Sequence, residues 1–138
     1  MPLKQISVFL ENKSGRLAEV TEILGKGGIN LRALSIADTA DFGICRLIVN
    51  NPDKTLKLLE DAGFTAKETD VLGVEVPDRP GGLAEVMKVF NENGVNIEYL
   101  YATLEMKEDK AVVIFRVEDL PLGLKIIEEH GWKGVVEV

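Results

Sequence analysis

The chain has 138 residues, 46% of them hydrophobic and 28% charged, the balance of an ordinary globular protein. Its formal net charge of −7, without any basic block, would repel a phosphate backbone and argues against nucleic acid as a partner. No segment reaches the roughly 18 uninterrupted apolar residues of a membrane span, and the alternation of apolar and polar residues from Lys4 onward leads us to expect no secretory signal. One cysteine excludes an internal disulfide, so we expect a cytoplasmic protein with no membrane partner.

Two hydrophobic periods predict the first elements. Apolar and polar residues alternate from Lys4 to Glu11, the period of a half-buried strand. Apolar residues then recur at helical spacing from Leu17 to Leu24, and Gly28 suits the left-handed position that ends a helix. Apolar strands follow at about 30–37 and 43–49.

A second helix has clear start and stop signals. Asn51 is a suitable N-cap, Pro52 lies in the first helical turn, and Gly63 suits the C-terminal end. A strand at about 65–71 follows it. This first part of the chain therefore has the order strand, helix, strand, strand, helix, strand.

The second half of the chain repeats the first. When residues 12–37 are aligned with residues 78–103, an offset of 66, eight of the 26 positions are identical. The offset becomes 68 afterwards, and a β-hairpin can accommodate the two extra residues. The repeat predicts strands at about 96–104, 111–117 and 132–138, and a helix between Asp119 and Gly131.

The predicted fold class is α+β, with two ferredoxin-like βαββαβ sandwiches. Strands without crossover helices pair antiparallel, and two helices can cover one face of a four-stranded sheet. We expect one domain over residues 1–70 and another over residues 71–138. No linker separates them, because residues 69–76 must serve the last strand of one copy and the first strand of the next.

The loop between the first strand and first helix of each copy carries the candidate binding residues. Gly15 or Gly81 at the start of a helix lets a ligand approach the backbone, where free N–H groups favour a carboxylate. Asn12 or Asp78 offers an oxygen to an ammonium group, and we expect the asparagine that begins the next strand to lie close by. The alternative is that these residues are ordinary helix caps and turn formers.

The same loops resemble the signature of ACT domains, the regulatory modules of many enzymes of amino-acid metabolism. The resemblance lies in Asp78–Leu83 with Gly94–Ile97 and in Asn12–Leu17 with Gly28–Leu31. It implies a βαββαβ fold, side-by-side pairing of domains, and amino-acid binding at the interface between paired domains.

The pattern is not followed everywhere. Ser14 stands where the family prefers proline, and Asp78 stands where serine-binding relatives carry asparagine. Those relatives also place a histidine where this chain has Leu10 and Val76. We expect the second loop to be the better site, because Gly81-Gly82 leaves backbone exposed whereas Arg16 crowds the first. The candidate ligand-binding residues are Asn12, Ser14, Gly15, Arg16, Leu17, Asn30, Asp78, Pro80, Gly81, Gly82, Leu83 and Asn96.

Residues suited to catalysis are scarce. His130, the one histidine, falls at a helix end, where a C-terminal cap is the expected role, and Cys45 lies in an apolar strand as a core residue. No metal-spaced cluster is present, so we expect no cofactor, no metal and no enzyme.

Two functions remain open. One is a regulatory protein that binds a free amino acid and modulates an enzyme of amino-acid metabolism. The alternative is an interaction subunit with a decayed ligand site that sets a partner enzyme's oligomeric state. In either case the open sheet faces favour a homo-oligomer.

Overall fold

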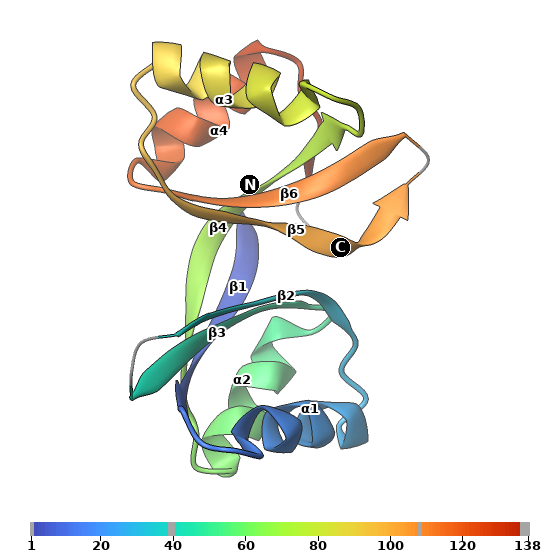
Figure 1. Ribbon diagram of the computed structural model, residues 1–138, viewed down its shortest axis with the longest axis vertical. Helices are drawn as coiled ribbons and strands as arrows, with labels where there is room; N and C mark the ends of the chain where they lie inside the picture. The colour runs from blue at the N-terminus through green and yellow to red at the C-terminus, as the bar shows by residue number, and fades with distance from the viewer. Residues whose placement is uncertain (1, 39–40, 108, 136–138) are drawn as a thin grey trace. The chain divides into compact units, whose positions relative to one another are not determined.

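The computed structural model describes residues 2–38, 41–107 and 109–135 (Figure 1). In chain order its elements are β1 (Leu3–Glu11), α1 (Arg16–Lys26), β2 (Leu31–Asp38), β3 (Phe42–Val49), α2 (Pro52–Asp61), β4 (Thr65–Pro77), α3 (Gly82–Glu92), β5 (Ile97–Lys107), β6 (Lys110–Val117), α4 (Leu120–Glu129) and β7 (Gly134–Val135). The predicted order of strands and helices is confirmed in both halves. The predicted last strand extends to residue 138, and its final three residues lie outside the described part.

The chain divides into two compact units. We call Lys4–Thr69 the N-terminal module; Asp70 onward, together with the start of the chain through Leu3, forms the C-terminal module. Strand β4 belongs to both, since its residues through Thr69 fall in one module and those from Asp70 in the other. The absence of a linker in the sequence thus corresponds to one strand of 13 residues.

The N-terminal module has the strand order β2-β3-β1-β4. Strand β3 pairs antiparallel with both β1 and β2, in registers that place Val8 opposite Cys45 and Ile36 opposite the same cysteine. Helices α1 and α2 lie on one side of this sheet (Figure 1). The buried core between them consists of Ile6, Val8, Leu10, Val20, Leu24, Ile29, Cys45, Leu47, Val49 and Leu59.

The C-terminal module repeats this arrangement, with the strand order β5-β6-β4-β7. Strand β6 pairs antiparallel with β4 and β5, and β7 pairs with β4 at Gly73 and Val74. Phe90 packs edge-on against Phe115 and Trp132, with ring centroids 5.4 and 5.7 Å apart. These contacts fix α3 against the sheet on the side that α4 also covers (Figure 1).

Capping residues delimit the helices as the sequence predicts. Asn51 and Asp119 are N-caps whose side chains accept hydrogen bonds of 3.1 Å from the amides of Lys54 and Leu122. Gly28 and Gly94 have left-handed backbone after α1 and α3, with φ of 75° and 72°. His130 is the C-cap of α4, and Cys45 is fully buried, so both predicted structural roles are confirmed.

Candidate functional site

Helices α1 and α3 begin differently from the other two. Their N-caps are Gly15 and Gly81, with φ of 87° and 84°, and neither helix start has a side-chain cap hydrogen bond. A left-handed backbone of this kind favours glycine because it lacks a Cβ. The loop side chains therefore do not cap these two helices as Asn51 and Asp119 cap α2 and α4, and the other half of the alternative, that the loop residues are turn formers, stays a prediction.

An uncapped helix start attracts an anion. The first turn carries N–H groups with no partner inside the helix, and the helix dipole adds partial positive charge there. At α1 the turn preceding the helix is closed by backbone hydrogen bonds from Lys13 N to Glu11 O (2.7 Å) and from Asn12 N to Asp41 O (2.9 Å). Backbone hydrogen bonds thus close the loop, and no side chain caps the start of α1.

A pocket of about 120 Å³ lies at this loop in the N-terminal module. Three of the predicted site residues, Asn12, Arg16 and Leu17, line it. The remaining lining residues are Leu10, Glu11, Lys13, Ile36 and Gly43. The structure therefore brings the loop, the start of α1 and the end of β2 together around one small cavity.

Both signs of charge border the pocket. Lys13 Nζ lies 2.9 Å from the Glu11 carboxylate, and Arg16 lies 3.9 Å from it and 3.1 Å from that of Glu19. The hydrogen bond from Lys13, reinforced by the charges of Lys13 and Arg16, lowers the pKa of the Glu11 carboxyl from its ordinary value. Glu11 therefore stays ionised at neutral pH, beside a guanidinium that still has donors to offer.

Comparison with known proteins identifies the fold family. A family model described as an ACT domain pair matches residues 1–131. The chain belongs to the ACT-domain family. The resemblance seen in the two loop motifs is thereby confirmed, and the pair corresponds to the duplicated modules.

Three relatives of this ACT domain pair illustrate its range. A protein of Bacteroides thetaiotaomicron with a crystal structure is 45% identical, with a TM-score of 0.92, and the match covers 98% of this chain and 92% of that one. The ligand-free regulatory subunit of aspartate kinase from Thermus thermophilus shares the fold at 19% identity, with a TM-score of 0.69 and coverage of 94% and 93%. The acetolactate synthase small subunit of Buchnera aphidicola subsp. Baizongia pistaciae (strain Bp) is 32% identical over 87 residues, 61% of this chain and 54% of that protein. The chain thus spans about half the length of this curated relative.

The second ACT loop differs from the first in a way the sequence did not reveal. Gly81 is exposed, as expected, but Gly82 is buried, and a Cβ there would overlap the carbonyl oxygen of Pro77. The expectation that both glycines expose backbone is therefore wrong for Gly82, which lets the helix pack closely on the preceding strand. Of the other predicted residues here, Asp78 and Pro80 are exposed and Leu83 is 38% exposed.

The expectation that Asn30 and Asn96 lie beside the loop of their own module is also wrong. Strands β1 and β2 both run antiparallel to β3, so they run parallel to each other. A helix that connects two parallel strands returns the chain to the end of the sheet where the first strand begins. The loop after β1 and the residue before β2 therefore lie at opposite ends of the strands, and the same holds for β4 and β5.

Each asparagine instead joins the start of one strand to the end of its neighbour. Asn30 N donates to Asn50 Oδ1 at 3.0 Å, and Asn96 Nδ2 donates to a Glu118 carboxylate oxygen at 3.0 Å. Ser14 is exposed in the loop beside Gly15. Of the first module's candidates, Asn12, Arg16 and Leu17 thus share a pocket, while Asn30 lies at the other end of the strands.

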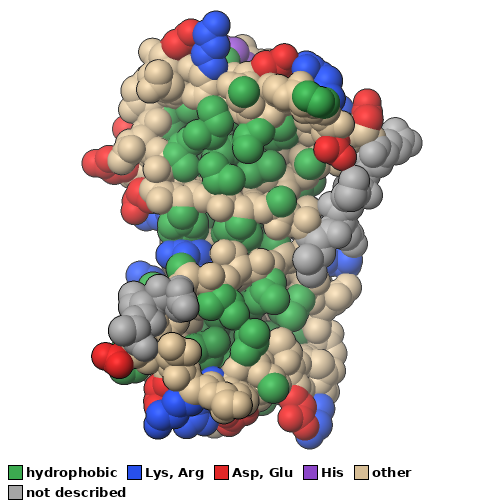
Figure 2. Space-filling view, viewed as in Figure 1, with side chains coloured by type: hydrophobic (Ala, Val, Ile, Leu, Met, Phe, Trp, Pro, Cys, Tyr) green, Lys and Arg blue, Asp and Glu red, His purple; other side chains and the backbone are tan. Residues whose placement is uncertain are grey.

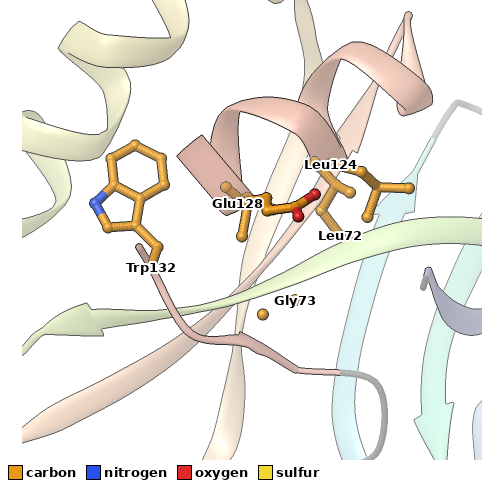
Figure 3. Close-up of a pocket in the computed structure, with 7 residues that line it drawn as sticks. Leu72, Gly73, Leu124, Glu128 and Trp132 are labelled. Carbon is orange, nitrogen blue, oxygen red and sulfur yellow. The ribbon is translucent and has the colours of Figure 1, made fainter. Parts of the chain in front are cut away.

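The C-terminal module also has a pocket that the sequence did not suggest. It measures about 300 Å³ and lies between α4 and strands β4 and β7. Figure 3 shows Trp132, Leu72 and Leu124 around it, with the carboxylate of Glu128 on the same helix as Leu124. In the sequence these apolar positions only indicate a core, because periodicity cannot distinguish a filled interior from a hollow one.

Other site types are not found among the described residues. The described parts contain no cluster of three or more histidine, cysteine, aspartate or glutamate side chains suited to a metal. Within those same residues, no helix has the length and apolar character needed to cross a membrane.

Proposed function

We propose that this ACT domain pair binds a free amino acid at the loop between β1 and α1 and thereby regulates a partner enzyme of amino-acid metabolism. The observation that carries the proposal is the start of α1, where a left-handed glycine leaves the helix without a side-chain cap beside a charged pocket. The similarity to an acetolactate synthase small subunit supports a role beside an enzyme, and we propose that the chain itself is non-catalytic and cytoplasmic.

The arrangement suits both charged groups of an amino acid. A carboxylate is attracted to the first-turn N–H groups of α1 and to the Arg16 guanidinium. An ammonium group finds the Glu11 carboxylate and the side-chain oxygen of Asn12, which line the same pocket. We therefore place the ligand at the first loop rather than the second, the reverse of the order expected from Gly81-Gly82.

The test is calorimetric titration of the full chain with each of the standard amino acids. One of them is expected to bind in the millimolar range or more tightly. Asn12→Ala is then expected to weaken binding by about tenfold or more, since a hydrogen bond to a charged group contributes roughly 1.5–3 kcal/mol. Asp78→Ala, in the other module, is expected to have a smaller effect.

Asn51→Ala provides the matched control. Asn51 is the N-cap of α2 in the same module, so its replacement lowers the free energy of unfolding without changing the loop between β1 and α1. Loss of binding in Asn12→Ala but not in Asn51→Ala supports the proposal. If no amino acid binds at millimolar concentration, the proposal is wrong and the interaction-subunit function takes its place.

A further inference from the structure

A larger pocket adjoins the loop pocket in the N-terminal module. Its volume is about 270 Å³, and Glu11 and Arg16 line both cavities. The other residues that line it are Phe9, Glu19, Phe42, Ala62, Gly63, Phe64 and Thr65. The pocket therefore joins the charged start of α1 to the turn between α2 and β4.

Aromatic side chains give this pocket its character. Phe9 and Phe42 are 46% and 54% exposed, although each carries a large apolar ring. Strand register places Glu11 opposite Phe42, and Phe9 is two residues before Glu11, so the three share one face of the sheet. Two exposed rings in the lining of one pocket present apolar area whose removal from water would favour binding of an apolar group.

The C-terminal module has a pocket at the equivalent place, with charged residues at two of the three phenylalanine positions. It measures about 280 Å³. At the offsets of the repeat, Glu75 replaces Phe9 and Lys110 replaces Phe42, while Trp132 corresponds to Phe64. Glu75 is paired with Lys133 at 3.5 Å, so charged side chains stand where the N-terminal pocket has rings. The fold creates the hollow in both modules, but only the N-terminal one carries phenylalanine rings at both of these strand positions.

We propose that the pocket at Phe9, Phe42 and Phe64 is a specificity pocket that receives the side chain of an amino acid with a large apolar, preferably aromatic, side chain. This inference rests on the proposed function. The ligand's charged groups lie at Arg16 and Glu11, which border both cavities, and its side chain extends over the phenylalanine rings. A volume of about 270 Å³ is at the small end for ligand sites and suits a molecule of amino-acid size.

The test compares ligands of the full chain that differ in one group each. L-phenylalanine is expected to bind about tenfold or more tightly than glycine, because its ring removes apolar surface from water. Two further probes, 2-phenylethylamine and 3-phenylpropionate, each lack one of the charged groups. Both are expected to bind about tenfold more weakly than phenylalanine, since each loses a charge-assisted contact.

Variants then introduce the residues of the other module. Phe42→Lys and Phe9→Glu place the counterparts Lys110 and Glu75 in the N-terminal pocket, and both positions are half exposed, so the fold should persist. Each is expected to remove the preference for phenylalanine over glycine. Lys110→Ala in the C-terminal pocket is the matched control and is expected to leave it unchanged.

Each failure has its own meaning. If amino acids bind with no preference for a large apolar side chain, or if Phe42→Lys leaves the preference intact, the specificity pocket is disproved while the proposed function stands. If no amino acid binds, both are wrong. If the amine and the acid bind as well as phenylalanine, the rings are only an adventitious apolar surface. If Phe42→Lys and Phe9→Glu change only the mass of the assembly, the rings form a contact between protein chains. Either of these last two results overturns the inference.

Discussion

The N-terminal and C-terminal modules share one backbone plan but differ at the surfaces where a ligand would lie. Both start their first helix at a left-handed glycine and cap their second with asparagine or aspartate. Where the first has Arg16, the second has a buried glycine, Gly82. The comparison shows that positions which determine backbone conformation match between the copies, whereas the side chains around the pockets do not.

Charge distribution follows the same division. Figure 2 shows hydrophobic side chains gathered on the visible face of each module, with many of the charged ones toward the helices. In the C-terminal loop, Arg79 is paired with Glu85 at 2.9 Å. In the N-terminal loop the corresponding acid, Glu19, is paired with Arg16 from the start of α1 itself. Both modules therefore have a glutamate in the first turn of the helix, but the arginine that pairs with it comes from a different position.

The largest expected difference in stability is between substitutions at the matching positions Gly82 and Arg16. Gly82→Ala should lower the free energy of unfolding by about 2 kcal/mol, because the new Cβ overlaps the backbone carbonyl of Pro77 and the helix must shift. Arg16→Ala, at the matching position, should change it by less than about 0.5 kcal/mol. Urea unfolding followed by circular dichroism measures both. Equal effects would show that the two helix starts are packed alike.

A smaller effect separates the capped helices from the uncapped ones. Asn51→Ala and Asp119→Ala should each lower stability by about 1 kcal/mol, since each removes the acceptor for a first-turn amide. Asn12→Ala and Asp78→Ala should cost less, because neither helix start has a side-chain cap. The same unfolding experiment measures all four. If the loop substitutions cost as much as the cap substitutions, the loop side chains have a structural role after all.

The smallest expected effect lies in the cores. Cys45 in β3 corresponds to Val113 in β6, and Cys45→Val should leave the free energy of unfolding at pH 7 nearly unchanged, because the two side chains are close in volume. Burial raises the pKa of the Cys45 thiol from 9.0 to about 11. The thiol therefore ionises at a lower pH in the unfolded chain than in the folded one. Its contribution to the free energy of unfolding is complete below pH 9 and is lost as pH rises toward 11.

Unfolding experiments across this pH range measure the difference. The wild-type chain should lose stability relative to Cys45→Val as pH rises, and its thiol should resist alkylation in the folded state. Rapid alkylation of the native protein at neutral pH would show that the core around β3 opens more easily than the buried contacts indicate.

Much of the fold could be predicted because its signals are local. Asn51 with Pro52 predicts a helix start from residue types alone, and Gly28 with Gly94 predicts two helix ends. The repeat then confirms each element through its copy. What could not be predicted depends on three-dimensional packing. The burial of Gly82 depends on the approach of Pro77, which no sequence pattern reports.

The site could be predicted only in part, for a related reason. Asn12, Arg16 and Leu17 are neighbours along the chain, so the sequence placed them together correctly. Asn30 was misplaced because its distance from the loop is set by the direction of β2 relative to β1. Phe9 and Phe42 were not suggested, although the alternation that buries Ile6, Val8 and Leu10 puts Phe9 on the opposite face of the strand, which is the signal that could have found it.

The most direct test of the account is the amide spectrum of the full chain, labelled with nitrogen-15, during titration with L-phenylalanine. The account predicts saturable shifts of the amides of Gly15, Arg16 and Leu17 at the uncapped start of α1, with shifts at Phe9 and Phe42 in the adjoining pocket. The resonances of the amides of Gly81 and Leu83, in the C-terminal module, should shift much less. Equal shifts at both loops, or none at α1 at millimolar ligand, would contradict it.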